Sequence, residues 1–222
     1  KAISTGFYQV TATYSQHSQL REFYRNGFWV SEPDALRSGP RLGVHGDFIT
    51  KDGTSFFPVG TNYFTTEENG WDFSGSRNAA VWEKDFSEME SHGVSFVRTG
   101  VWMPNARFID GDLGGANERF LRNLEAFLLT AHQHHIAVNF TFFAFSPKSG
   151  AVRPPRDATV SPNPYLDPAA VRAEQAYIRS VVERFKDVPW LCWDLINEPS
   201  FSNPEHVFKG NYPNADPAEL AA

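Results

Sequence analysis

The sequence predicts an α/β fold, namely the first half of a (β/α)8 TIM barrel preceded by a β-hairpin. Four strongly apolar segments have the length of strands, and roughly 35 to 55 residues separate each from the next, as in such barrels. A helical pattern fills each interval. Strands that are apolar on both faces and alternate with helices form a parallel sheet covered by helices. Four strands are half of a barrel that usually has about 250 residues, and a small open α/β sheet is the structural alternative.

The first 30 residues are predicted to form a β-hairpin. Residues 6–14 alternate apolar and polar side chains, and residues 20–30 are rich in aromatic side chains and suit the antiparallel partner strand. An isolated hairpin is only marginally stable in water. We therefore interpret residues 1–31 as the end of a β-sandwich domain, whose other strands are absent here or lie in another chain.

A change in composition follows this hairpin. Residues 32–41 have the proline and glycine content of a linker, and residues 42–222 are predicted to form barrel strands 1 to 4 with their helices. At the start of this region, residues 42–49 and 56–59 are expected to pair around Asp52-Gly53, because Asp-Gly supplies the positive φ angles of a tight turn.

The predicted barrel strands are residues 57–62, 94–99, 136–142 and 190–196. The first helix between them carries Trp82, Phe86 and Met89 on one face, and Gly93 suits its carboxyl end.

The same kind of pattern, an apolar stripe with capping residues, predicts two further helices. The helix at residues 118–134 has a buried stripe of Phe120, Leu124, Phe127, Leu128 and Ala131. The last helix begins at Asp167 and Pro168, which suit the N-cap and first helical position. Its predicted buried face consists of Val171, Ile178, Val181, Val182 and Phe185.

Charge and composition exclude several classes of function. The net charge is −6 and the basic residues are scattered, so the chain lacks the basic patch of a protein that binds nucleic acid or an anionic membrane. No run of about 18 to 20 apolar residues is present, and the amino terminus lacks a signal-peptide pattern. Lys1 leads almost directly into a strand, so either a leader has been removed or the start is a cut inside a longer polypeptide. A secreted or periplasmic location is slightly favoured.

We expect no cofactor. No glycine-rich phosphate loop follows any predicted strand, which argues against a nucleotide site. Cys192 lies within an apolar run, cannot form an internal disulfide and is interpreted as a core residue. His132, His134 and His135 invite a metal interpretation, but they end a helix and no carboxylate or cysteine completes a ligand set, so we expect no metal.

Chemically capable side chains follow the predicted strands. The first strand ends at Asn62 and Tyr63, and the second carries Arg98 with Trp102 close behind it. Phe143 follows the third strand, and the fourth ends with Asn197 and Glu198. Because side chains at the carboxyl ends of barrel strands converge on one mouth, these residues together predict a site there.

A carboxyl group in such a mouth can act as a general acid, since desolvation or a second nearby carboxylate raises its pKa. Glu198 has this position, with a local capping or pairing role as the alternative. Asn197 could donate to a sugar hydroxyl, or be a turn residue before Pro199. Arg98 requires an anionic partner if buried, and either a catalytic carboxylate or a structural ion pair would serve.

The chain resembles the clan A glycoside hydrolases, in particular the cellulase-like family 5 enzymes or a close relative. The residues that carry the resemblance are Phe96-Val97-Arg98-Thr99 and Trp193-Asp194-Leu195-Ile196-Asn197-Glu198-Pro199, with weaker support from Asp52-Gly53 and Gly60-Thr61-Asn62. It spans about residues 42–202, the amino-terminal half of such a barrel.

The resemblance implies roles for individual residues. It makes Glu198 the acid/base, Asn197 the binder of the sugar 2-hydroxyl, and Arg98 the cation that orients the nucleophile. Asn62, Tyr63, Trp102 and Phe143 are the expected substrate-binding residues. The implied activity is retaining hydrolysis of O-glycosidic bonds in a β-linked oligo- or polysaccharide, so a carbohydrate is the expected partner.

The nucleophile of this family does not carry over to the chain. In the family it is a glutamate at the end of the seventh strand, whereas only Glu205 and Glu219 follow Glu198 here, without three intervening strand-helix units. We expect the nucleophile and the rest of the barrel to come from the same polypeptide or from another chain. The alternative is a non-catalytic carbohydrate-binding or assembly module built on a partial glycosidase barrel.

Overall fold

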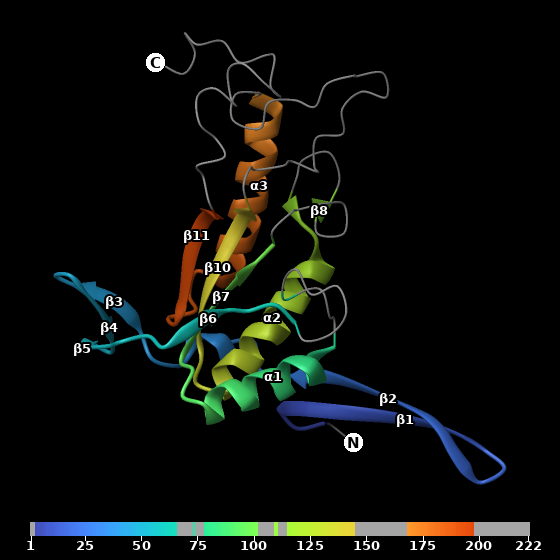
Figure 1. The fold of residues 1–222 in the computed structure, drawn as a ribbon. Helices are drawn as coiled ribbons and strands as arrows, with labels where there is room; N and C mark the ends of the chain where they lie inside the picture. Colours follow the sequence, from blue (N-terminus) through green and yellow to red (C-terminus); the bar gives the residue numbers. More distant parts are fainter. Residues whose placement is uncertain are drawn as a thin grey trace. The chain divides into compact units, whose positions relative to one another are not determined.

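The computed structural model describes residues 3–65, 73, 78–101, 109–110, 115–144 and 168–197. Strands and helices follow one another along the chain as drawn in Figure 1. In order they are β1 (Gly6–Gln16), β2 (Gln19–Val30), the 3-10 helix η1 (Ala35–Arg37), β3 (Leu42–His45), β4 (Phe48–Lys51), β5 (Thr54–Ser55), β6 (Gly60–Asn62), α1 (Ala79–Ser91), β7 (Phe96–Gly100), β8 (Ile109–Asp110), β9 (Gly115–Ala116), α2 (Glu118–Gln133), β10 (Ala137–Ala144), α3 (Pro168–Phe185) and β11 (Leu191–Asn197).

The predicted α/β fold with a parallel sheet is confirmed. Four strands form a sheet in the order β11-β10-β7-β6, and successive strands of this sheet are separated in the sequence by α1, α2 and α3. Strands β6 and β7 pair in parallel, with Gly60 opposite Phe96 and Asn62 opposite Arg98. That these strands are half of a closed barrel stays a prediction.

The chain divides into two compact units, of which the first has its core around Phe127. This unit comprises Lys1–Thr99, Asn123–Asn139 and Asp187–Cys192. The Phe127 ring lies 4.9 Å from Phe73, 5.2 Å from Phe86, 5.5 Å from Trp82 and 5.7 Å from Tyr63, measured between ring centroids. The predicted stripe of α2 is fully confirmed, because Phe120, Leu124, Phe127, Leu128 and Ala131 are all buried.

Helix α1 begins and ends at specific capping residues. The Asn78 side chain accepts a hydrogen bond from the Ala80 amide at 3.0 Å and so caps the first turn. At the other end, Gly93 has a φ of 79° and donates to the Glu90 carbonyl, while the Val94 amide donates to the Met89 carbonyl, both at 3.0 Å. This Schellman arrangement confirms the predicted role of Gly93.

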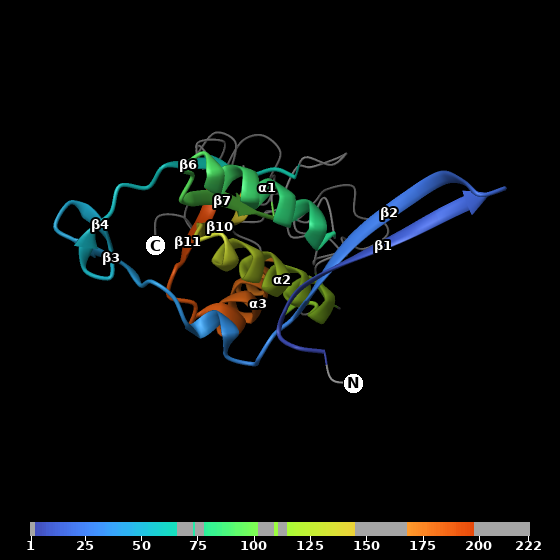
Figure 2. The same cartoon turned by 90° about the horizontal axis from the view of Figure 1, so that it is seen from below.

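The predicted amino-terminal hairpin forms, and one of its faces is attached to the helices at its base. Strands β1 and β2 pair antiparallel from Gly6 opposite Val30 to the turn at residues 17–18. The Trp29 indole donates to the Thr130 hydroxyl at 2.9 Å. Away from this base the hairpin projects past α1 and α2 (Figures 1 and 2).

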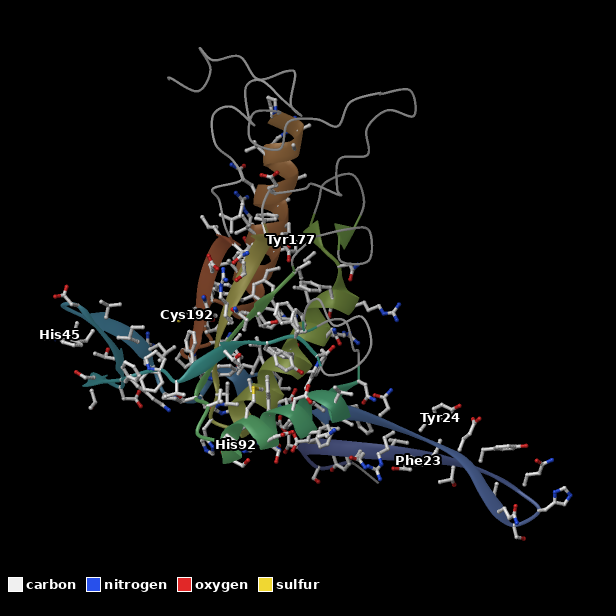
Figure 3. All side chains as sticks on the ribbon, viewed as in Figure 1. Phe23, Tyr24, His45, His92, Tyr177 and Cys192 are labelled. Carbon is white, nitrogen blue, oxygen red and sulfur yellow. The ribbon has the colours of Figure 1, made fainter. Side chains whose placement is uncertain are left out.

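The opposite face of the hairpin carries exposed aromatic and apolar side chains. Tyr8 stacks on Phe28 with centroids 5.4 Å apart, and Val10, Tyr14 and Tyr24 lie on the same face and are exposed. Figure 3 shows Phe23 and Tyr24 on the projecting part of the ribbon. That residues 1–31 belong to a β-sandwich stays a prediction.

The next hairpin differs from its prediction. The expected strand at residues 42–49 is divided into β3 and β4, because Gly46, with a φ of 58°, turns the chain between them. Residues 56–59 form no strand, and β5 pairs instead with the end of β4. The turn at Asp52 and Gly53 has the expected positive φ angles of 52° and 77°.

The second unit has its core around Tyr177 of α3. It comprises Gly100–Arg122, Phe140–Lys186 and Trp193–Ala222. Tyr177 is buried, with its ring 5.9 Å from Phe142 and 5.8 Å from Phe143. The predicted face of α3 was partly wrong, because the buried residues are Ala170, Ala173, Tyr177, Val181 and Phe185. Val171, Ile178 and Val182 are only partly buried. Asp167, the predicted N-cap, lies outside the described residues.

Candidate active site

In the first unit, Asn62 at the carboxyl end of β6 is the neighbour of Arg98, the middle residue of β7. They lie opposite each other in the parallel register, and the Tyr63 amide donates to the Arg98 carbonyl at 2.8 Å. Val97 and Thr99 are buried, whereas Arg98 between them is partly exposed, as alternation along a strand requires. The structure thus brings together two of the predicted site residues.

Tyr63 points in another direction, into the helix layer. It is 4% exposed, its hydroxyl donates to Asp85 of α1 at 2.7 Å, and its ring packs on Phe86 and Phe127. The Thr99 hydroxyl donates to the Tyr63 carbonyl at 3.1 Å. These contacts make Tyr63 a packing residue of the first unit, so we leave it out of the proposed site.

In the second unit, Phe143 and Asn197 lie on β10 and β11. Phe143 is 5% exposed and packs on Tyr177, which leaves little of its ring for a ligand in this arrangement. Asn197 is partly buried and is the last residue of β11. Glu198 and Trp102 lie outside the described residues, so their predicted roles stay predictions.

A polar contact that the sequence-based reasoning did not identify joins β10 to β11. The Thr141 hydroxyl donates to Oδ2 of Asp194 at 2.9 Å, three residues before Asn197. Thr141 is 1% exposed and Asp194 is partly buried. A charged side chain within an otherwise apolar strand was the signal in the sequence, but its partner depends on the register between strands.

The histidines at the end of α2 have carboxylate partners, contrary to the sequence-based expectation. Nδ1 of His134 lies 2.8 Å from Glu90 and its Nε2 lies 3.1 Å from Glu83, while Nδ1 of His135 lies 2.8 Å from Glu90. Both glutamates come from α1, which the local sequence of α2 could not reveal. Across the described residues, no group of three or more His, Cys, Asp and Glu side chains is arranged to hold a metal ion.

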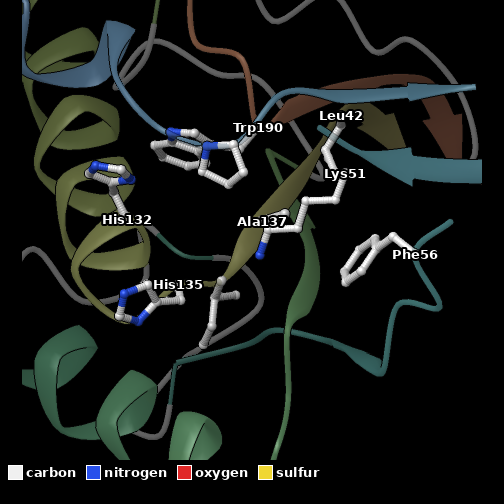
Figure 4. A pocket seen from close by; sticks show the side chains of 9 residues that line it. Leu42, Lys51, Phe56, His132, His135, Ala137 and Trp190 are labelled. Carbon is white, nitrogen blue, oxygen red and sulfur yellow. The ribbon is translucent and has the colours of Figure 1, made fainter. Parts of the chain in front are cut away.

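An apolar pocket in the first unit lies at the amino-terminal ends of β10 and β11 (Figure 4). Its wall includes Ala137, the first residue of β10, and Trp190, which precedes β11. His132 stacks on Trp190 with centroids 5.3 Å apart, and burial, together with the charge of His135, lowers the pKa of His132. Neither Asn62 nor Arg98 lines this pocket, so the pocket is separate from the candidate site.

Comparison with solved structures finds a similar fold in several glycosidases. The endo-1,4-β-mannanase from Rhizomucor miehei superposes with a TM-score of 0.55 at 20% identity, over 72% of this chain and 48% of that chain. The exo-β-1,4-mannosidase from an Opitutaceae bacterium gives a TM-score of 0.55 at 23% identity, over 75% of this chain and 28% of that chain. The β-1,4-D-mannanase from Cryptopygus antarcticus gives 0.53 at 14% identity, over 72% and 45%.

These likenesses show a glycosidase-like α/β fold. This chain spans less than half the length of each of these three proteins. No protein-family model and no curated protein matches the sequence. None of the described helices is long and apolar enough to cross a membrane.

Proposed function

We propose that this chain carries the acid/base half of a retaining glycoside hydrolase that cleaves O-glycosidic bonds in a β-linked oligo- or polysaccharide. The observation that carries the proposal is the end of β11 at Asn197, with Glu198 next in the sequence. Strand β11 belongs to the same four-stranded sheet as β7, which carries Arg98. The likeness of the fold to several β-mannan-degrading enzymes supports the same reaction class.

The proposed reaction is a double displacement. Glu198 donates its proton to the oxygen of the leaving group while a second carboxylate, from residues beyond these 222, attacks the anomeric carbon and forms a glycosyl ester. Glu198 then removes a proton from the water that attacks the same carbon, the ester bond breaks, and the sugar leaves with its original anomeric configuration.

The other residues of the proposed site bind and orient in this scheme. The Asn197 amide donates to the sugar 2-hydroxyl, an interaction that strengthens as the transition state forms. Arg98 orients the attacking carboxylate by a charge-assisted hydrogen bond. Asn62, opposite Arg98 in the register, contributes an amide that can bind a further hydroxyl.

The substrate to test first is β-1,4-mannan. The three structural neighbours are named as an endo-1,4-β-mannanase from Rhizomucor miehei, a β-1,4-D-mannanase from Cryptopygus antarcticus and an exo-β-1,4-mannosidase. An exo enzyme releases single mannose units whereas an endo enzyme shortens the chain internally, so the size of the products distinguishes the two.

The deciding experiment is Glu198→Gln in the intact protein, assayed on β-mannan and on an aryl β-mannoside. We expect kcat to fall by about 10²- to 10⁴-fold, because the acid/base can no longer transfer a proton. Glu205→Gln is the matched control, since it neutralises the next carboxylate in the sequence, which has no proposed role, and it should keep full activity. NMR of the first product anomer tests retention. Unchanged hydrolysis by the Glu198 variant would contradict the assignment.

The same preparation tests the alternative function. If the intact protein binds β-mannan without releasing reducing sugar, the hydrolase proposal fails and a carbohydrate-binding or assembly module replaces it. If it releases sugar only when Glu198 is present, the binding module is excluded.

A further inference from the structure

We propose that Thr141 and Asp194 form a positioning pair for the proposed acid/base, fixing the register of β11 on β10 and holding a carboxylate on the strand that leads into Asn197 and Glu198. This inference rests on the proposed function, because it concerns the same strand end. Neither residue is assigned to contact the sugar. Each acts through β11.

The contacts on the two faces of β11 support a register role. On one face Trp193 packs on the aromatic rings of β10, with centroids 5.5 Å from Phe142 and 6.1 Å from Phe140. On the other face Asp194 accepts the hydrogen bond from Thr141, which lies between those two phenylalanines in the sequence. The aromatic side chains of the two strands therefore pack together on one face, and Thr141 and Asp194 are hydrogen-bonded to each other on the other face.

A slip of β11 by one residue would destroy both sets of contacts. Because side chains alternate along a strand, the slip would turn Asp194 toward the face of Phe140 and Phe142. A carboxylate among aromatic rings without a hydrogen-bond donor is strongly disfavoured. The Thr141 hydroxyl would also lose its partner in a site where it is 1% exposed. The pair thus selects the one register that delivers Asn197 to its present position.

Thr141 is itself held from the β7 side. The Val101 amide donates to the Thr141 carbonyl at 3.1 Å. A Cβ atom on Gly100 would overlap that carbonyl, so the two backbones approach more closely than any other residue type at position 100 permits. The Thr141 backbone is therefore hydrogen-bonded to Val101 and its hydroxyl to Asp194, so Thr141 has a fixed position against which β11 is aligned.

Loss of the hydrogen bond between Thr141 and Asp194 has one consequence for catalysis. It loosens β11, and a misplacement of about 1 Å can reduce a rate by about 10²-fold. The loss should appear in kcat rather than in KM, because neither residue is assigned to contact the sugar.

Three variants of the intact protein test this effect. Thr141→Val removes the donor, and we expect kcat to fall about 10- to 100-fold with KM within about twofold. Thr141→Ser keeps the donor and should keep kcat close to that of the parent protein. Asp194→Ala removes the acceptor of the same hydrogen bond and should lower kcat to a similar extent, again with KM within about twofold.

Thr99→Val is the matched control. It removes another buried strand hydroxyl, one that donates to the Tyr63 carbonyl, and it should leave kcat and the pH profile unchanged. If Thr141→Val does not fold, Asp194→Ala still decides. A kcat in Thr141→Val and Asp194→Ala that is no lower than in the control overturns the positioning role. Activity that survives Glu198→Gln overturns the proposed function instead.

Discussion

His135 holds the left-handed position after α2, with a φ of 58°, that Gly93 holds after α1 with a φ of 79°. The two helices end in the same hydrogen-bond pattern. After α2, the Ile136 amide donates to the Ala131 carbonyl at 2.9 Å and the His135 amide donates to the His132 carbonyl at 3.1 Å. A residue with a Cβ atom therefore stands where glycine is preferred, because left-handed backbone costs about 1 to 2 kcal/mol for other residues.

We predict that His135→Gly stabilises the protein by about 1 kcal/mol. The change relieves the left-handed strain and loses the hydrogen bond to Glu90, which is worth little because the His135 side chain is 80% exposed. Urea unfolding measures the difference. Gly93→Ala is the converse control and should destabilise by about 1 kcal/mol. Lower stability in the His135 variant would mean that the bond to Glu90 outweighs the strain.

Glu90 is predicted to stabilise the protein at neutral pH and not in acid. Hydrogen bonds from His135 and His134 hold the pKa of Glu90 below its usual range. A depressed carboxyl pKa adds stability above its unfolded value of about 4.3, and that stability is lost as the pH falls through the folded value. Glu90→Gln should therefore unfold more easily at pH 6 by up to about 1 kcal/mol after solvent screening.

Thermal unfolding at pH 3 and pH 6 tests this difference, with Glu88→Gln as a control on the same exposed side of α1. The Glu90 variant should approach the parent protein at pH 3, and the Glu88 variant should follow the parent at both values. An equal loss of stability at both pH values would assign the effect of Glu90 to packing.

Glu174 should make the protein less stable as the pH rises. Burial raises the pKa of Glu174 to about 8, and its buried Oε1 atom has no hydrogen-bond partner among the described residues. Between about pH 4.5 and pH 8 the folded protein keeps the proton while the unfolded chain loses it, so stability declines through this window. Glu174→Gln should remove about 1 to 2 kcal/mol of that decline, allowing for the partial exposure of the side chain.

Melting temperatures measured from pH 4 to pH 9 reveal this slope. Glu183→Gln, an exposed glutamate on the same helix, is the control and should leave the slope unchanged. A steep decline that persists in the Glu174 variant would show that other groups cause it.

Gly100→Ala is predicted to destabilise the protein by about 1 to 3 kcal/mol, the usual effect of overpacking. The new methyl group would overlap the Thr141 carbonyl, which is backbone and cannot rotate away. Gly115→Ala is the matched control, because nothing lies within 4 Å of a Cβ atom at that position. Equal unfolding free energies for the two variants would contradict the close approach of β7 and β10.

The sequence predicted the elements whose buried face is built from large apolar residues. The stripe through Phe127 on α2 has a regular helical period, and each of its members is buried. Helix α3 was less predictable because small residues form part of its face. Ala170 and Ala173 carry little hydrophobic signal, so a search for large side chains selected Val171 and Ile178 instead.

The candidate site was also predicted only in part from the sequence. The position of Asn62 at a strand end followed from the sequence, because it depends only on where the strand stops. Arg98, expected near the end of its strand, is the middle residue of β7, which continues to Gly100. The direction of Tyr63 did not follow from the sequence, since adjacent residues point to opposite faces and a shift of one residue exchanges them. The Thr141 and Asp194 contact required the register between two strands that are 53 residues apart in the sequence, and local patterns contain no information on that register.

We expect the base and the turn end of the β1–β2 hairpin to differ in local stability, although one ladder of hydrogen bonds joins them. Near its base, Trp29 is bonded to Thr130 of α2, so opening the ladder there must also break packing in the first unit. Toward the turn, Tyr14 and Tyr24 are exposed and the strands contact mainly each other. Amide hydrogen exchange should therefore be slow beside Trp29 and fast beside Tyr14, and a partner bound to the aromatic face would slow exchange selectively near the turn.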